Sequence, residues 1–228
     1  QANDLLTGDA NANTITGGPG DDTLFGGGGD DRYLFGNGSG WDTVHENASG
    51  GWDVLDFSGV ASPLTFSVHT YTVVDTDTRV DYDANVENLI GGSGKDTLSY
   101  AGDGVVHTVT LTGLGVEDGF AGIASGLSGT FENMNALAAG SGDDALIGLN
   151  AANTWTVDGI SSQYASGGRV FGFDSRVETL WGALAVINSR LLVPKAANSR
   201  ATPGMTGSTL LKALCSPVHS TAAWGQIP

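Results

Sequence analysis

The chain has 228 residues and a formal net charge of −16, because 25 acidic side chains face only 9 lysines and arginines. This charge would repel phosphate backbones, so it excludes a nucleic-acid-binding surface. The one cysteine, Cys215, excludes a disulfide framework and a Cys-x-x-Cys metal or redox site. The chain also lacks a run of about 18 apolar residues that would cross a membrane as a helix.

A nine-residue unit occurs twice in succession in residues 17–34, as GGPGDDTLF and GGGGDDRYL. Each copy has glycine at places one, two and four, aspartate at place six and a large apolar residue at place eight. Glycine reaches positive φ without steric cost, so the backbone can coil tightly and point carbonyl oxygens inward beside Asp22 and Asp31. Calcium prefers carbonyl and carboxylate oxygens as ligands. The unit therefore predicts a calcium loop followed by a short strand that buries Leu24 or Tyr33.

This GGxGxDxUx pattern resembles the nonapeptide repeat of the RTX (repeats-in-toxin) family. The resemblance implies an all-β fold, a right-handed parallel β-roll or β-solenoid, in which two repeats form one coil and calcium lies between loops stacked on the same edge. The loop ending at Asn13 should then stack on the loop ending at Asp31, and the loop ending at Asp22 on that ending at Asp42. Two departures from the pattern are Asn13, which replaces an aspartate, and Asp42, which comes two residues late. The expected metal-binding positions are Gly8, Asn13, Gly17, Pro19, Asp22, Gly26, Gly28, Asp31, Gly36, Gly38 and Asp42.

A longer repeat follows, in which Glu87, Glu132 and Glu178 recur with a period of about 45 residues, the signature of stacked supersecondary units. The first two copies each include a glycine–aspartate loop, which makes Asp96 and Asp144 further candidate metal ligands. Segments rich in valine, threonine and aromatic residues predict the intervening strands. They are residues 63–83, which should hold two or three strands, 105–112, 154–157 and 169–173.

Three regions are expected from these patterns: a nonapeptide β-roll over residues 1–59, a solenoid of longer repeats over 60–182, and an atypical tail over 183–228. The tail contains no Asp or Glu, and it holds Cys215. It is expected to be either sequence foreign to the repeat protein or a cap, with residues 178–192 as an amphipathic helix. Since the sequence begins within the repeats, the chain is expected to be a piece of a larger protein.

An enzymatic function would have to rely on the four histidines, His45, His69, His107 and His219. None of them lies in a GxSxG, HExxH or paired-histidine motif. A fragment with esterase or phosphoesterase activity that uses the roll as a scaffold is kept as the alternative function. A carbohydrate ligand is a further alternative, because exposed tryptophan and tyrosine rings can stack on sugars. The candidates for such stacking are Trp41, Trp52 and Tyr71.

The favoured function is a calcium-binding structural or adhesive repeat module of a bacterial protein that is secreted or displayed on the cell surface. Without calcium the stacked carboxylates should repel one another, and binding of the ion should drive folding. Calcium is the expected cofactor, and a cell-surface or carbohydrate ligand is an expected class of partner. Because the ends of a solenoid expose strand edges, association between copies of the chain is also expected.

Overall fold

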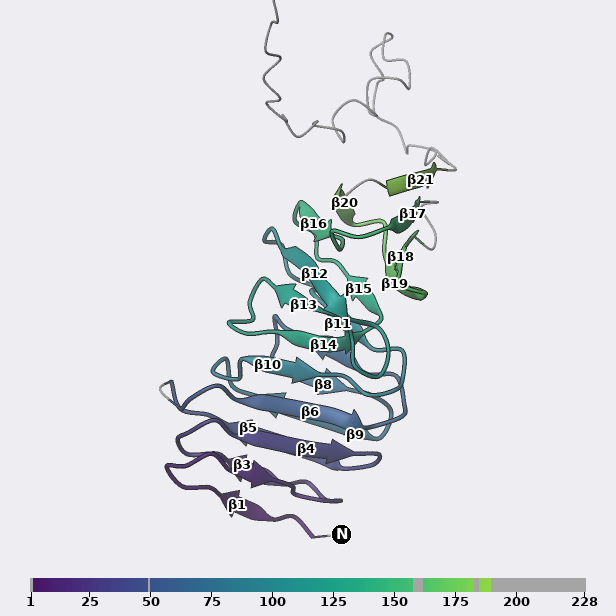
Figure 1. Ribbon diagram of the computed structural model, residues 1–228. Coiled ribbons are helices and arrows are strands. Elements are labelled where there is room, and N and C mark those ends of the chain that lie inside the picture. The colour runs from purple at the N-terminus through teal and green to yellow at the C-terminus, as the bar shows by residue number, and fades with distance from the viewer. Residues whose placement is uncertain (1, 49, 158–161, 183–184, 190–228) are drawn as a thin grey trace, which may run out of the picture. The chain divides into compact units, whose positions relative to one another are not determined.

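Short strands alternate between two sheets along the described chain (Figure 1), which comprises residues 2–48, 50–157, 162–182 and 185–189 of the computed structural model. The first sheet contains β1 (Leu5–Thr7), β3 (Thr23–Phe25), β5 (Gly40–His45), β7 (Thr65–Ser67), β8 (Thr72–Val74), β9 (Thr78–Tyr82), β11 (Thr97–Ser99), β15 (Ala136–Ala138), β17 (Asn153–Val157), β18 (Ser162–Ser166), β19 (Arg169–Phe173) and β21 (Ala185–Ser189). The second sheet contains β2 (Thr14–Ile15), β4 (Arg32–Gly36), β6 (Val54–Gly59), β10 (Asn88–Ile90), β12 (Thr108–Leu114), β13 (Phe120–Ala124), β14 (Phe131–Met134), β16 (Asp144–Ile147) and β20 (Val177–Trp181).

In the N-terminal coils each visit to a sheet is a single strand, and successive coils pair in parallel. In the first sheet Leu6 is in register with Leu24, and Leu24 with Val44. In the second sheet Tyr33 is in register with Ile15 on one side and Leu55 on the other. Because alternate residues of a strand point to opposite faces, these columns of large apolar side chains face inward and form the core.

The expected burial of the eighth residue of each unit is confirmed. Leu24 and Tyr33 are fully buried, and so are the corresponding Leu98 and Leu146 of the later loops. Trp155 occupies the same kind of buried position after the degenerate loop that ends at Asn153. The periodicity of the sequence therefore sets which side chains form the core throughout the described coils.

Three antiparallel meanders interrupt the parallel coils. In the first sheet β5 pairs in parallel with β9, and β9, β8 and β7 follow as an antiparallel set before β11 pairs in parallel with β7. The same arrangement recurs in the second sheet, where β12, β13 and β14 lie between β10 and β16. It recurs once more in the first sheet, where β17, β18 and β19 lie between β15 and β21. The sheets are therefore mixed, whereas a parallel roll was expected.

The meanders account for the period of about 45 residues. One unit consists of a meander and two single strands, so it visits the sheets three times. An odd number of visits places the next meander in the opposite sheet. Segment 63–83 accordingly supplies three strands, β7, β8 and β9, as the sequence suggested. Both sheets continue across residue 59, where the single-strand coils give way to the meanders.

The expected helix over residues 178–192 is wrong. Residues 177–181 form β20, in which Leu180 is in register with Leu146 and Trp181 with Ile147. Residues 185–189 form β21, which pairs in parallel with β17. A helix would leave the backbone groups of β16 and β17 without these partners, so sheet pairing prevails over the helical period of the leucines. The rest of the tail, with Cys215 and His219, lies outside the described residues.

The described part of the chain contains strands and turns, and none of it forms a helix that is long and apolar enough to cross a membrane.

Candidate metal centre

The turns between the sheets form two edges. At the first edge the chain passes from the nine-stranded into the twelve-stranded sheet, and at the second edge it passes back. At the first edge the backbone N–H of Asp4 donates to Oδ1 of Asp22 at 2.8 Å, and that of Asp22 donates to Oδ1 of Asp42 at 3.0 Å. One carboxylate per coil thus holds the backbone of the preceding coil.

The second edge has the same arrangement one half-coil later. The N–H of Asn13 donates to Oδ1 of Asp31 at 2.7 Å, and the N–H of Asp31 donates to Oδ1 of Asp53 at 2.8 Å. The series ends where the N–H of Asp53 donates to Oε2 of Glu87 at 2.7 Å. We call these two series of carboxylates the aspartate ladder. The loops that the sequence analysis expected to stack, at Asn13 and Asp31 and at Asp22 and Asp42, are therefore side by side.

Each ladder hydrogen bond uses only one oxygen of its carboxylate. Within the described residues, Oδ2 of Asp22, Asp31, Asp53 and Asp96 is buried and has no hydrogen-bond partner. A buried carboxylate oxygen without compensation costs free energy, which a bound cation can offset. Burial raises the pKa of Asp31, and it raises the pKa of Asp42 to about 6. These side chains fit a hard cation such as calcium, which takes carboxylate and carbonyl oxygens.

The first glycine of each N-terminal loop lies against these side-chain oxygens. A Cβ added at Gly17 would collide with Oδ2 of Asp22, and one at Gly26 would collide with Oδ2 of Asp31. A Cβ at Gly8 would collide in the same way with Oδ1 of Asn13. Glycine is therefore required at these places because the backbone itself borders the carboxylate or carboxamide group.

The remaining predicted positions differ in their surroundings. Gly28 donates its N–H to the carbonyl of Asp9 at 2.8 Å, which joins two stacked loops of the second edge. Pro19 is exposed in its turn. A Cβ added at Gly36 or Gly38 would meet none of the described atoms within 4 Å, so neither glycine is packed against a carboxylate. In the loop ending at Asp42 the aspartate therefore still accepts the N–H of Asp22, but neither Gly36 nor Gly38 packs against its carboxylate.

Residues 1–33 match the family model of the RTX calcium-binding nonapeptide repeat, in four copies. The N-terminal coils are RTX calcium-binding repeats. The match ends at residue 33, whereas the ladder that starts in these RTX repeats continues through Asp42 and Asp53. No curated protein sequence matches the chain.

A second aspartate stands at place five, directly before the aspartate at place six, in three of the glycine-rich loops. Asp21, Asp30 and Asp143 are exposed. Two of them also hold the next coil, because Oδ1 of Asp21 accepts the N–H of Trp41 at 3.1 Å and Oδ1 of Asp30 accepts that of Trp52 at 2.9 Å. They therefore fix the turns that carry the two exposed tryptophans.

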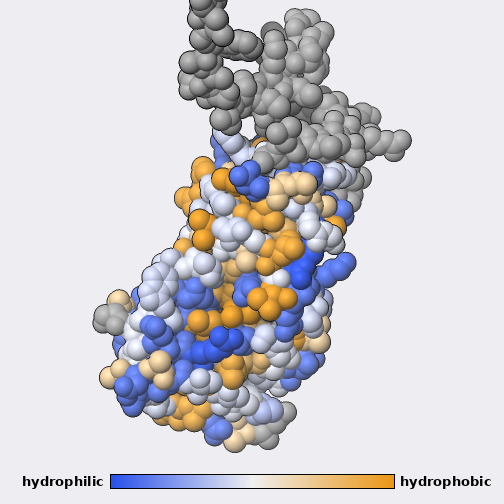
Figure 2. Space-filling model, viewed as in Figure 1, coloured by the Kyte–Doolittle hydropathy of each residue, from blue (hydrophilic) through white to orange (hydrophobic). Residues whose placement is uncertain are grey.

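The exposed tryptophans do not form one stacking platform for a sugar. Figure 2 shows hydrophobic patches interspersed with hydrophilic residues on one face of the chain. Trp41 is 66% exposed and follows the first edge, whereas Trp52 is 56% exposed and lies at the second edge. Tyr71 lies in the turn between β7 and β8. The three rings thus belong to three different parts of the coil.

Asp96, beyond the matched RTX repeats, has the features of a ladder residue. Its Oδ1 accepts the N–H of Leu64 at 2.8 Å, its own N–H donates to Oδ1 of Asn135 at 2.8 Å, and its Oδ2 is buried without a hydrogen-bond partner in the described chain. A Cβ at Gly91 would lie 2.5 Å from Oδ2. Burial raises the pKa of Asp96 to about 6. This isolated loop therefore offers a carboxylate oxygen as the RTX loops do.

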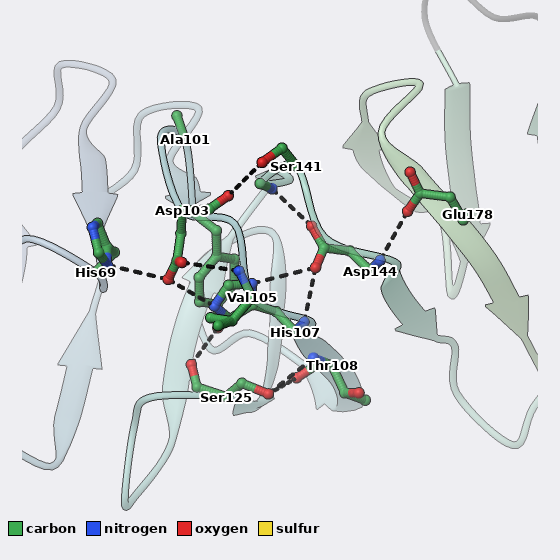
Figure 3. A network of polar contacts seen from close by, with 12 residues as sticks. His69, Ala101, Asp103, Val105, His107, Thr108, Ser125, Ser141, Asp144 and Glu178 are labelled. Carbon is green, nitrogen blue, oxygen red and sulfur yellow. Dashed lines mark hydrogen bonds and ion pairs between the residues drawn. The ribbon is translucent and has the colours of Figure 1, made fainter.

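Asp144 differs from the other loop aspartates because both of its oxygens are engaged (Figure 3). Oδ1 accepts the N–H of His107 at 2.8 Å and lies 3.3 Å from Nδ1 of the same histidine, while Oδ2 accepts the N–H of Gly140 at 2.7 Å. Nε2 of His107 lies 3.1 Å from Asp103, and its ring stacks on Tyr100 at 3.9 Å. The His107 imidazole thus lies between the carboxylates of Asp103 and Asp144. In the loops of Asp22, Asp31 and Asp96, by contrast, Oδ2 of the aspartate has no hydrogen-bond partner among the described residues.

Each of the three described histidines contacts a carboxylate. His45 contacts Asp83, and His69 contacts Asp103. A cavity of about 290 Å³ opens beside His69 and His107, and Ser125 lines it. The hydroxyl of Ser125, however, accepts the N–H of Thr108 at 2.9 Å and is directed to the backbone of β12. The histidines thus pair with carboxylates and do not activate this hydroxyl.

The sequence analysis missed several residues of the two edges. Asp53 belongs to a Gly-Trp-Asp triplet that repeats residues 40–42, and this repetition could have revealed it as a ladder residue. Glu87 accepts the N–H of Asp53, and Glu178 accepts the N–H of Asp144. The two glutamates thus recur in the sequence because each holds the backbone of a loop aspartate. Glu46 follows β5 outside every repeat, and no sequence signal indicates it.

Proposed function

We propose that the chain is a calcium-dependent structural or adhesive segment of a secreted or surface-displayed bacterial protein, and that it folds when calcium binds. The presence of RTX repeats establishes a calcium-binding repeat module, and the wider role is our inference from it. One observation carries the proposal. Buried Oδ2 atoms at both edges, those of Asp22, Asp31, Asp53 and Asp96, have no hydrogen-bond partner within the described residues.

The proposed ligands are the carboxylates of the ladder, with loop oxygens from the glycine-rich turns. At the first edge they are Asp22 and Asp42 with the backbone of Gly17, Pro19, Gly36 and Gly38, and at the second edge Asn13, Asp31 and Asp53 with the backbone of Gly8, Gly26 and Gly28. Asp96 is proposed as an additional site. We assign no ion to Asp144, because His107 and Gly140 engage both of its oxygens.

Calcium would supply positive charge between carboxylates that otherwise repel one another across successive coils. Without that charge the net charge of −16 opposes the compact state. Binding restricted to the folded chain stabilises it in proportion to the logarithm of the calcium concentration. Calcium is abundant outside cells and scarce in the cytosol, so the chain would stay loose until export. We also propose that its coils are right-handed, the hand that parallel strand connections strongly favour.

Calcium binding itself can be tested by isothermal titration of the whole chain, with Asp31→Asn as the variant and Asp77→Asn as the matched control. Asp77 is exposed in the turn between β8 and β9 and is not one of the proposed ligands, so its substitution removes the same charge from outside the binding set. We expect Asp31→Asn to reduce the number of ions bound or their affinity and Asp77→Asn to leave both unchanged. Equal titrations for the two variants would remove Asp31 from the binding site.

A further inference from the structure

The second edge contains a group of three carboxylates that the RTX pattern does not provide. Asp31 leads into β4, Glu46 follows β5 and Asp53 leads into β6, so consecutive turns of the chain bring the three together. One ligand oxygen from each lies within 4.8 Å of the other two, and all three side chains are buried. Glu46 makes this group different from the paired carboxylates of the first edge.

Two carboxylate oxygens of this group have no hydrogen-bond partner in the part of the chain that the structure describes. They are Oδ2 of Asp31 and Oδ2 of Asp53, whose residues are 1% and 0% exposed. The other oxygen of each carboxylate is taken by the ladder, through the N–H of Asn13 and of Asp31. The neighbouring arginine, Arg32, pairs with Asp56 and leaves the group without its charge. Buried like charges of this kind are costly unless a cation or a proton compensates them.

Glu46 is held in place by groups that do not neutralise it. The hydroxyl of Tyr33 donates to Oε1 of Glu46, and Tyr33 is itself fully buried. A Cβ at Gly26 would collide with Oε1 of Glu46 and Oδ2 of Asp31, and a Cβ at Gly50 would lie 3.0 Å from Oε2 of Glu46. In the folded chain the backbone of Gly26 and Gly50 thus borders the carboxylates and limits the positions that their side chains can take.

We propose that Asp31, Glu46 and Asp53 bind one calcium ion together, that this is the tightest site of the chain, and that it fixes the junction between the RTX repeats and the first meander. The proposal rests on the proposed calcium-binding function and deepens it. Calcium sites gain affinity with the number of charged ligands and with their rigidity. This site has three carboxylates, whereas the first edge offers two carboxylates per pair of coils, those of Asp22 and Asp42.

The test measures the successive calcium dissociation constants of the whole chain, from the tightest to the weakest, by competition with a chromophoric chelator at neutral pH. The variants are Glu46→Gln, which keeps an acceptor for Tyr33 but removes the charge, and Asp42→Asn, which removes one charge from the first edge. We expect Glu46→Gln to weaken the tightest constant about tenfold or more and to leave the weaker ones within about twofold. Asp42→Asn should give the opposite pattern, and Asp77→Asn should change neither.

An unchanged tightest constant in Glu46→Gln, with calcium still bound elsewhere, would overturn the proposal and leave the RTX sites standing. A wild-type chain that binds no calcium would instead refute the proposed function itself. Circular dichroism in ten-millimolar calcium checks that each variant folds. Should Glu46→Gln fail to fold, Tyr33→Phe decides, because it removes only the hydroxyl that positions Glu46. The tightest constant should then weaken several-fold, and an unchanged constant would contradict the proposal.

Discussion

The backbone N–H of Asp22 donates to Oδ1 of Asp42, one coil further along the chain, at 3.0 Å. The same contact links Asp31 to Asp53 at the second edge. Because Oδ1 serves the backbone, the direction of each carboxylate is fixed, and Oδ2 of Asp22, Asp31 and Asp53 is left buried without a hydrogen bond in the described chain. The ladder thus aligns successive coils and at the same time prepares their calcium ligands.

Replacing Asp31 with asparagine should have opposite effects in the two calcium states. The amide keeps an acceptor for the N–H of Asn13 but loses the charge that repels Glu46 and Asp53. In EGTA the melting temperature should therefore rise or stay level, whereas in saturating calcium it should fall. Thermal melts of both states measure this. An equal drop in the two states would mean that Asp31 acts through packing and not through the metal.

The stability of the calcium-free chain should decrease as pH rises from about 4 to about 7. Burial raises the pKa of Asp42 and Asp96 to about 6 and that of Glu46 to about 7. The folded state then holds more protons than the unfolded state in this range, so raising the pH favours unfolding. Melting temperatures in EGTA should fall across the range, and saturating calcium should abolish or reverse the trend. A rise in EGTA would contradict the assignment of buried, uncompensated carboxylates.

Substituting alanine for Gly26 should destabilise the calcium-loaded chain. The new Cβ would collide with Oδ2 of Asp31 and Oε1 of Glu46, and such overpacking typically costs about 1–3 kcal/mol. Gly113→Ala is the matched control, because its Cβ would meet no described atom within 4 Å and Gly113 is not a proposed ligand. Calcium-loaded melts should separate the two variants clearly. Similar melting temperatures would show that the second edge is more open than the structure indicates.

Replacing His107 with alanine should destabilise the chain equally with and without calcium. The substitution leaves Asp144 and Asp103 without their shared imidazole, and a buried polar group that loses its hydrogen-bond partner typically costs about 1–3 kcal/mol. The partly exposed His69, which contacts Asp103 only, should matter less. Chemical unfolding in EGTA and in calcium measures both effects. A loss confined to the calcium-loaded state would show that the loop at Asp144 does bind an ion.

The sequence was sufficient to predict the repeating part of the structure. A glycine-rich turn followed by a strand is a local pattern, so the burial of Leu24 and Tyr33 could be read from a nine-residue period, whereas the stacking of the loops was implied by the resemblance to the RTX family. The isolated loop at Asp96 could be found for the same reason. These features depend on residues close together in the chain, where turn geometry and side-chain alternation decide the outcome.

The meanders and Glu46 could not be predicted in this way. Nothing local in the sequences of β7 and β9 indicates their partners, and only long-range pairing places β9 beside β5 and β7 beside β11. Glu46 and Asp53 reach Asp31 because the turn between β5 and β6 stacks on the turn between β3 and β4 at the second edge, which no local pattern encodes. The helix expected over residues 178–192 failed because pairing of β20 with β16 outweighs a helical spacing of leucines.

The most direct test of the account is far-UV circular dichroism with thermal melting, first in EGTA and then across a calcium titration from micromolar to ten millimolar. We predict a weakly folded chain with a low melting temperature in EGTA, a gain of β-structure as calcium is added, and a melting temperature that rises with calcium concentration. A chain that is fully folded in EGTA and whose melting temperature ignores calcium would contradict calcium-coupled folding. The buried oxygens of Asp22, Asp31, Asp53 and Asp96 would then need another partner.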